Sequence, residues 1–410
     1  MIFNDLLNSI GNTPVIKIRN LSPKNINIFV KAEYFNPGGS VKDRLALSII
    51  ENAENDGMLS PGQTVVEATS GNTGIGLAMV CATKGYPCVV TMPDSTSIER
   101  RKLMRFLGAK VLLTPASEGT TAAYDLAKKL SDKNNWFYAQ QFENKANADI
   151  HEKTTAIEIL NDFKDIGLDY WVSGYGTGGT FSGVSRVLKE KSPNTKLIIT
   201  EPENAQLINS KISQERNSEN APISTHEAWN PHPIQGWTPD FIPFVLQETI
   251  DNNYFDQNIP VSGDDGIFWA KELASKEGII TGVSGGSTFA IAMEVAKVAK
   301  KYSNILCMIP DTAERYLSSI LFEDIERQYP YSKWAAKSQL MSAYCYYKSQ
   351  FYDESLNSLD RFISLHPASK DIGYAYYLKS LNYFYQIEDV ERDQSMTEIA
   401  LNSFQNVINK

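Results

Sequence analysis

The stretch TVVEATSGNTGIGLAMVCATKGYPCVVTM, residues 64–92, contains a complete strand–helix–strand unit. Its two apolar runs, at 64–68 and 88–92, have the length and composition of buried strands. Between them lies a helix-length run of small and apolar residues, and Gly85 stands where a helix C-cap belongs. Parallel strands need such a crossover, so the stretch predicts an α/β fold with a mostly parallel sheet covered on both faces.

The same alternation continues along most of the chain, up to about residue 322. Further strand-like runs occur at 110–114, 170–174, 196–200 and 304–310, and helical patterns occur at 98–108 and 288–302. A segment of this length favours two lobes over one.

The composition changes near residue 322. From Glu323 onward the chain has one glycine of its 25 and 11 of its 20 tyrosines. No strand pattern remains, and aromatic-rich helical runs follow the Tyr329-Pro330 and His366-Pro367 pairs. We therefore predict an α/β domain over 1–322 and an all-α domain of tetratricopeptide-like repeats over 323–410.

Charge and composition exclude several classes of function. The net charge of -9 and the pI near 5.2 argue against a general nucleic-acid binder. The four cysteines form no C-x-x-C pair and the four histidines show no ligand spacing, so we expect reduced thiols and no metal site. Neither a membrane span nor a signal peptide is visible, which makes a cytoplasmic location the expectation.

Three glycine-rich turns lie where strands pass into helices, the usual position of ligands in α/β sheets. In the first, EATSGNTGIG at 67–76, hydroxyl and amide side chains gather at a helix N-terminus. This arrangement suits a carboxylate, although a hydroxyl-rich capping loop remains an equal alternative.

The second turn is GYGTGGT at 174–180, and its backbone N–H groups could close around a phosphate. The same glycines satisfy G-x-G-x-x-G, and Glu201 follows at the distance of a ribose-binding acid. A nicotinamide-dependent oxidoreductase is therefore an alternative. The third turn, TGVSGGST at 281–288, offers Ser284 either as a partner for a ring nitrogen or as a helix cap.

A lysine in an unusual position completes the set of candidate site residues. In NPGGSVKDR at 36–44, Ser40 and Asp43 match a capping box, which predicts Ser40 as the N-cap and Lys42 at the second helical position. The helix field there should lower the pKa of the Lys42 amine and favour imine formation with an aldehyde. The alternative is an ordinary solvated lysine.

Motifs spread along residues 1–322 resemble the cysteine synthase family (O-acetylserine sulfhydrylases), pyridoxal-phosphate enzymes of fold type II. They are NPGGSVKDR, EATSGNTGIGLA, QQFENKAN (140–147), GYGTGGT, IQGWTPDFIP (234–243), GVSGGST and PDTAERYLS (310–318). The resemblance implies a two-lobed core with a smaller, mobile lobe at about 45–150. Gly285-Gly286 departs from a common form of the third turn in this family.

The resemblance also implies a role for each candidate residue. Lys42 would carry the cofactor as an imine and remove the α-proton of the substrate, while Ser284 would bond the pyridine nitrogen. Asn72 would bond the 3′-oxygen of the cofactor, and Gly176, Thr177, Gly178, Gly179 and Thr180 would hold its phosphate. Substrate would be bound by Thr69, Ser70, Gly71, Thr73 and Gln141, with Gly236 on a loop facing the site.

The implied reaction is β-replacement: sulfide replaces the acetate of O-acetyl-L-serine through an aminoacrylate, giving L-cysteine (an O-acetylserine (thiol)-lyase, a transferase). The resemblance further implies a homodimer and a serine acetyltransferase whose C-terminal tail binds in the active site. Cystathionine formation from serine and homocysteine is the neighbouring alternative. A non-enzymatic alternative is a helical scaffold or interaction protein.

Residues 323–410 resemble the first repeats of the outer-membrane assembly lipoprotein BamD, a periplasmic family anchored through a lipid-modified cysteine. Two explanations are open for this combination. One is a genuine fusion in which the helices act as a scaffold. The other is a fragment joined by a frameshift, deletion or assembly error, and the missing export signal and unfinished repeat array favour it.

Overall fold

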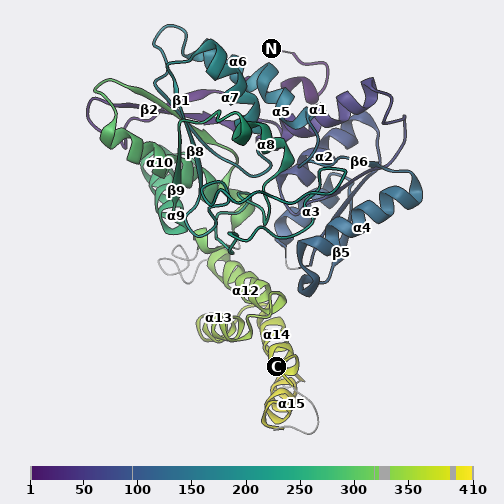
Figure 1. The fold of residues 1–410 in the computed structure, drawn as a ribbon. Coiled ribbons are helices and arrows are strands. Elements are labelled where there is room, and N and C mark those ends of the chain that lie inside the picture. Colours follow the sequence, from purple (N-terminus) through teal and green to yellow (C-terminus); the bar gives the residue numbers. More distant parts are fainter. Residues whose placement is uncertain (1, 95, 318, 323–332, 388–393, 409–410) are drawn as a thin grey trace. The chain divides into compact units, whose positions relative to one another are not determined.

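The computed structural model describes residues 2–94, 96–317, 319–322, 333–387 and 394–408 (Figure 1). Contacts divide the chain into two compact units. The first comprises Met1–Thr91, Arg100–Leu112 and Tyr124–Ala313, and the second comprises Met92–Glu99, Leu113–Ala123 and Glu314–Lys410. The domain limits of 1–322 and 323–410, and the smaller lobe at about 45–150, stay predictions.

A six-stranded mixed sheet forms the larger core, in the order β1-β2-β10-β7-β8-β9. Only β1 runs antiparallel to its neighbour, and the other pairs are parallel. The strands are β1 Val15–Lys17, β2 Asn27–Ala32, β7 Tyr170–Gly174, β8 Lys196–Pro202, β9 Gln257–Val261 and β10 Asn304–Ile309.

A smaller four-stranded sheet has the order β5-β4-β3-β6. Its strands are β3 Val65–Ala68, β4 Cys88–Pro93, β5 Lys110–Thr114 and β6 Phe137–Tyr138. β3 pairs in parallel with both β4 and β6, as the crossover at 64–92 predicts. Every apolar run that the sequence marks as a strand forms one, so the predicted α/β class is confirmed.

The helices of the α/β region are α1 Lys42–Asn55, α2 Asn72–Lys84, α3 Ile98–Phe106, α4 Gly119–Asn134, α5 Ala146–Ile150, α6 Ala156–Asp162, α7 Gly179–Lys191, α8 Phe244–Asp251, α9 Gly263–Glu272 and α10 Val283–Val298. Two π-helical turns, His151–Thr155 and Leu273–Glu277, interrupt this pattern. Short 3-10 turns occur at Leu7–Ser9, Glu33–Phe35, Ala116–Glu118, Ala313–Tyr316 and Ile320–Phe322.

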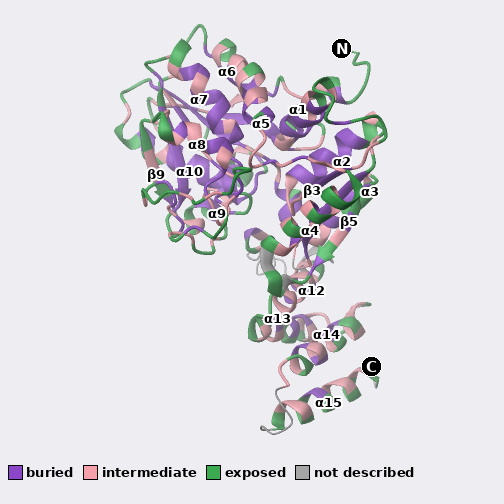
Figure 2. Cartoon of the chain, turned by 45° about the vertical axis from the view of Figure 1, so that its right-hand side comes forward, coloured by how far each residue is buried: buried purple, intermediate pink, exposed green. Residues whose placement is uncertain are grey.

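Apolar side chains of the large sheet pack against helices. Alternate strand residues, among them Trp171, Leu197 and Leu306, form one cluster with Phe181 and other residues of α6 and α7. α10 packs against β7, β9 and β10, and Figure 2 shows it largely in the colour of buried residues. Burial of α10 follows from its composition, which contains one charged residue in its first fourteen positions.

The C-terminal region is all-α, which confirms that prediction. Its helices are α12 Lys333–Lys348, α13 Tyr352–Leu365, α14 Ile372–Phe384 and α15 Ser395–Ile408. α12, α13 and α14 pack around Leu340, Leu359, Phe362 and Leu378, and α15 packs on α14. In the described parts of the chain, no helix is both long and apolar enough to cross a membrane.

Candidate active site

The glycine-rich turn at 174–180 joins β7 to the N-terminus of α7. Gly178 has the left-handed φ of +86° and precedes the first helical residue. A Cβ at Gly176 would lie 2.2 Å from the carbonyl oxygen of Gly236, and one at Gly179 would lie 2.0 Å from Asn147 Oδ1. The first N–H groups of α7 have no acceptor within their own helix, so this cradle suits an anion.

Replacing Gly179 by alanine should therefore damage this cradle. The added methyl group would overlap the Asn147 amide, which is itself held by its Nδ2 bond to the Gln141 carbonyl, 2.8 Å away. We expect the affinity for pyridoxal phosphate to fall at least about tenfold, measured by absorbance titration of the apoprotein. Gly57→Ala is a control for the loss of a glycine, because its Cβ would meet no atom within 4 Å. An unchanged affinity in the Gly179 variant would contradict the assignment of the cradle.

Lys42 reaches this cradle from a distant part of the chain. Its Nζ donates to Thr177 Oγ1, 3.4 Å away. Burial lowers the pKa of the Lys42 amine to about 8, and the charge of Asp311 partly opposes the shift. The lowered pKa was expected from the sequence, but burial is its main cause.

The capping interactions before Lys42 differ from the predicted box. α1 begins at Lys42 itself, not one residue earlier, and Val41 is its N-cap. Ser40 Oγ accepts from the Lys42 N–H at 3.2 Å, whereas the Asp43 carboxylate accepts from the N–H of Gly38 at 2.6 Å. Gly38 lies so close to the Asp43 side chain that a Cβ at position 38 would be 2.5 Å from Asp43 Oδ1. This position therefore needs a glycine.

The turn at 67–76 places its polar residues around the start of α2, with Gly71 as the N-cap. Thr69 Oγ1 accepts from the N–H of Gly71 at 3.2 Å. Asn72 Nδ2 donates to Asp311 Oδ2 at 2.6 Å, and Thr73 Oγ1 donates to Gln141 Oε1 at 2.7 Å. The structure thus brings together Thr73 and Gln141, two of the residues predicted to bind the substrate.

The loop at 234–243 lies beside both turns. Gly236 has a φ of +85°, and its carbonyl faces Gly176. Arg100 links the loop to the first turn, because its guanidinium donates to Gln235 Oε1 at 3.0 Å and lies 3.5 Å from the Ser70 carbonyl oxygen.

Ser284 is a separate case. It lies in the first turn of α10 and is only 3% exposed. Within the described residues, its hydroxyl makes no hydrogen bond to the other predicted site residues.

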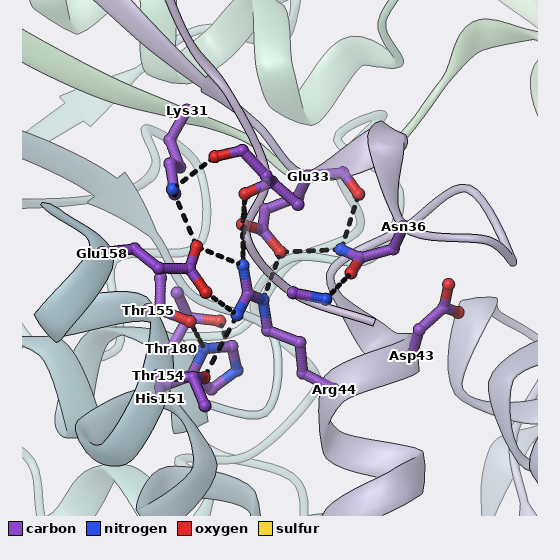
Figure 3. A network of polar contacts seen from close by, with 12 residues as sticks. Lys31, Glu33, Asn36, Asp43, Arg44, His151, Thr154, Thr155, Glu158 and Thr180 are labelled. Atoms are coloured by element: carbon purple, nitrogen blue, oxygen red, sulfur yellow. Dashed lines mark hydrogen bonds and ion pairs between the residues drawn. The ribbon is translucent and has the colours of Figure 1, made fainter. Parts of the chain in front are cut away.

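A buried histidine stands behind the anion cradle (Figure 3). His151 Nε2 lies 3.2 Å from Thr180 Oγ1, and its Nδ1 lies 2.8 Å from Thr155 Oγ1. Burial, together with the charges of Arg44 and Lys42, lowers the pKa of His151 well below its usual value. The ring is therefore neutral and acts as a fixed hydrogen-bond partner of Thr180.

Figure 3 also shows the ion cluster that anchors the start of α1. Arg44 Nε donates to Glu33 at 2.8 Å, and its Nη1 donates to Glu158 at 2.7 Å. Lys31 adds a third link, 2.8 Å from Glu158. Burial opposes ionisation of Glu158, but Arg44 and Lys31 outweigh it and lower its pKa to about 2.

The oxidoreductase alternative requires Glu201 to bind a ribose, but its carboxylate already accepts hydrogen bonds from other residues. The Glu201 carboxylate accepts from the N–H groups of Ile208 and Asn209, each at 3.0 Å, and from Asn258 Nδ2 at 2.7 Å. It also accepts from the Tyr175 hydroxyl at 3.1 Å. Four donors leave this buried carboxylate little capacity to bind a ribose.

Sequence reasoning missed several residues of the site: Glu67, Asn147, His151 and Asp311. Asp311 had a usable signal, since it follows the buried strand β10 at its carboxyl end. His151 had none, because nothing in its local sequence indicates a contact with Thr180, 29 positions away.

Residues 6–311 match the family described as "Pyridoxal-phosphate dependent enzyme", and residues 313–410 match the family described as "Outer membrane lipoprotein". An O-ureido-L-serine synthase of Streptomyces lavendulae is 42% identical over 79% of this chain and 94% of its own length. A cysteine synthase of Staphylococcus aureus is 43% identical over 76% of this chain and 95% of its own. The crystal structure of a cysteine synthase of Entamoeba histolytica superposes with a TM-score of 0.70 at 34% identity, covering 78% of this chain and 91% of the other.

The described residues fit the cofactor of this family. The cradle at 176–180 has the glycines and helix N-terminus that a phosphate needs, and the Lys42 amine lies beside it. Buried Ser284 offers a hydroxyl at the start of a third helix. The match over residues 6–311 and the near-complete coverage of the relatives agree with this chemistry. The chain is a member of the pyridoxal-phosphate dependent enzyme family, similar to cysteine synthases, and carries a C-terminal region similar to an outer membrane lipoprotein.

Proposed function

We propose that the protein is a cysteine synthase, which replaces the acetate of O-acetyl-L-serine by sulfide. The observation that carries this proposal is the contact of the Lys42 amine with Thr177, which puts a proton acceptor beside the anion cradle. The carboxylate-suited turn with Thr73 and Gln141 supports it, as does the similarity to cysteine synthases.

We further propose how the residues divide the work. Thr69, Ser70, Gly71, Thr73 and Gln141 bind the substrate carboxylate, and Gly236 lies on the loop that covers the site. Gly176, Thr177, Gly178, Gly179 and Thr180 hold the cofactor phosphate, Ser284 its ring nitrogen and Asn72 its 3′-oxygen. Bound pyridoxal phosphate supplies an electron-withdrawing ring that stabilises negative charge at the substrate Cα.

Lys42 would carry the cofactor and move the proton of the reaction. Its neutral amine accepts the α-proton, and the nearby charge of Asp311 stabilises the ammonium that results. Acetate leaves Cβ with the bonding electron pair, the sulfur of hydrosulfide forms the new bond, and Lys42 returns the proton to Cα. O-acetylserine and hydrosulfide thus give cysteine and acetate.

One comparison favours a second reaction, in which a different nucleophile adds to the same amino-acid substrate. The relative named O-ureido-L-serine synthase is 42% identical, which is close to the identity of the cysteine synthase. An oxygen nucleophile such as hydroxyurea would give an O-ureido product by the same replacement at Cβ. Cystathionine formation from serine and homocysteine is the third member of this series.

Competing these reactions tests the proposal. Purified protein with pyridoxal phosphate should be yellow and should form cysteine from O-acetylserine and sulfide at the highest kcat/KM of the series. A higher kcat/KM with hydroxyurea, or with serine and homocysteine, would replace the proposed reaction by that one. A colourless protein that binds NAD would overturn the whole assignment.

We also propose that the enzyme is a cytoplasmic homodimer, and that a serine acetyltransferase tail can bind at its active site. The motifs shared with cysteine synthases support both associations. The chemistry uses residues up to Asp311, so we propose that the helices at 323–410 take no part in it.

A further inference from the structure

Glu67 is a buried acid next to the substrate turn to which the reaction above assigns no role. It occupies the penultimate position of β3, directly before the turn, and is 1% exposed. Its Oε1 lies 3.4 Å from Gln141 Nε2. Its Oε2 has no hydrogen-bond partner among the described residues, which is costly for a buried carboxylate if it is ionised.

Gln141 joins this acid to the turn. Gln141 Nε2 lies near two acceptors, Glu67 Oε1 and the Ala68 carbonyl oxygen at 3.3 Å. These acceptors fix the orientation of the amide, so Oε1 faces the Thr73 hydroxyl and accepts from it at 2.7 Å. A continuous hydrogen-bonded chain therefore runs from Glu67 through Gln141 to Thr73.

The groups around Glu67 oppose its ionisation. Burial and, to a lesser extent, the negative charge of Glu143 raise the pKa of Glu67 to about 8, although hydrogen bonds to Gln141 and Ala68 oppose the shift. Burial also raises the pKa of Glu143, to about 7, although Arg216 opposes this. Tyr124 and Tyr138 face the same two acids, and burial raises the pKa of each phenol, so both stay neutral and add no charge beside Glu67. At neutral pH the proton resides on Glu67.

We propose that Glu67 is a positioning residue that, in its neutral form, holds Gln141 and Thr73 in place and so fixes the shape of the turn that binds the substrate carboxylate. Ionised Glu67 would draw the Gln141 amide toward itself and place a negative charge behind a turn that binds an anion. Binding of the amino acid weakens as Glu67 loses its proton. This inference rests on the proposed function, because it takes the turn at 69–73 as the carboxylate site.

L-Serine is a suitable probe, since it has the carboxylate and amine of the substrate but a poor leaving group. Its Kd for the holoenzyme is measured from cofactor absorbance between pH 6.5 and 9, in the native protein and in Glu67→Gln. Titrations of the serine amine and of the cofactor are common to both proteins, so the ratio of the two Kd values isolates Glu67. We expect this ratio to rise on the order of tenfold across the range, as like-charge effects of about one pKa unit imply.

A second variant keeps the test decisive if Glu67→Gln folds poorly. Glu143→Gln removes the charge that raises the pKa of Glu67, so the weakening of serine binding should begin at lower pH. A pH-independent Kd ratio in the first variant, or an unshifted onset in the second, overturns the positioning role. Failure of the proposed function is recognised separately, from the kcat/KM values of the native protein with the competing substrates, which do not depend on either variant.

Discussion

Replacing Lys42 by alanine is expected to lower the rate of cysteine formation at least about a thousandfold, because the variant loses the group that accepts and returns the α-proton. The amine donates to Thr177 Oγ1 of the cradle at 3.4 Å. Steady-state assays with saturating O-acetylserine and sulfide measure the loss in kcat. The yellow colour of the protein as purified should be lost as well, since the variant lacks the amine that would hold the cofactor as an imine.

The control for this variant is Lys102→Ala, which removes an exposed lysine of α3. Its rate should stay within about twofold of the native value, as for most surface substitutions. Retention of more than about a tenth of the native rate by Lys42→Ala would mean that another group moves the α-proton.

Replacing Arg44 by methionine should lower the free energy of unfolding by about 3–5 kcal/mol, because removal of one partner leaves a buried charge uncompensated. Arg44 and Glu33 are 1% and 0% exposed, and the guanidinium donates to both oxygens of Glu33. Glu158 keeps Lys31 as a partner, so the cost falls mainly on Glu33. Urea unfolding monitored by tryptophan fluorescence measures the difference.

Two further variants show whether the lost charge balance is the cause. Lys297→Met breaks an exposed ion pair with Glu294 and should change the free energy of unfolding by less than about 1 kcal/mol. Adding Glu33→Gln to Arg44→Met should recover part of the loss, since the uncompensated charge is then gone. If Arg44→Met unfolds at the same urea concentration as the native protein, the cluster does not stabilise this fold.

The long apolar runs were the most predictable part of the fold. β5 and β7 coincide with the runs KVLLT and YWVSG. Short runs rich in apolar residues and bounded by polar or turn residues are typical of buried strands. β6 has only two residues and β9 contains Pro260 and exposed positions, so neither produces a clear pattern. Such strands form because neighbouring strands supply the pairing.

The candidate site was predictable where function lies in a continuous motif. The turns at 67–76 and 174–180 carry their chemistry in adjacent residues, and Lys42 stands out by its position at a helix start. Glu67, His151 and Asp311 are single residues whose partners are remote in sequence, as in the 239-residue separation of Asn72 and Asp311. Their roles emerge only once the sheets have formed.

Asp311 has a consequence for any attempt to shorten or recombine this protein. Its side chain binds Asn72, its backbone bridges to Ser40, and the adjacent Pro310 carbonyl accepts from the N–H of Val41. Strands near the end of the α/β region thus close on the turn where its first long helix starts. A piece cut before Pro310 would lose the contacts with Val41, Ser40 and Asn72, which hold the residues around Lys42. The start of the helix that carries Lys42 therefore depends on residues that the chain supplies only after its last strand.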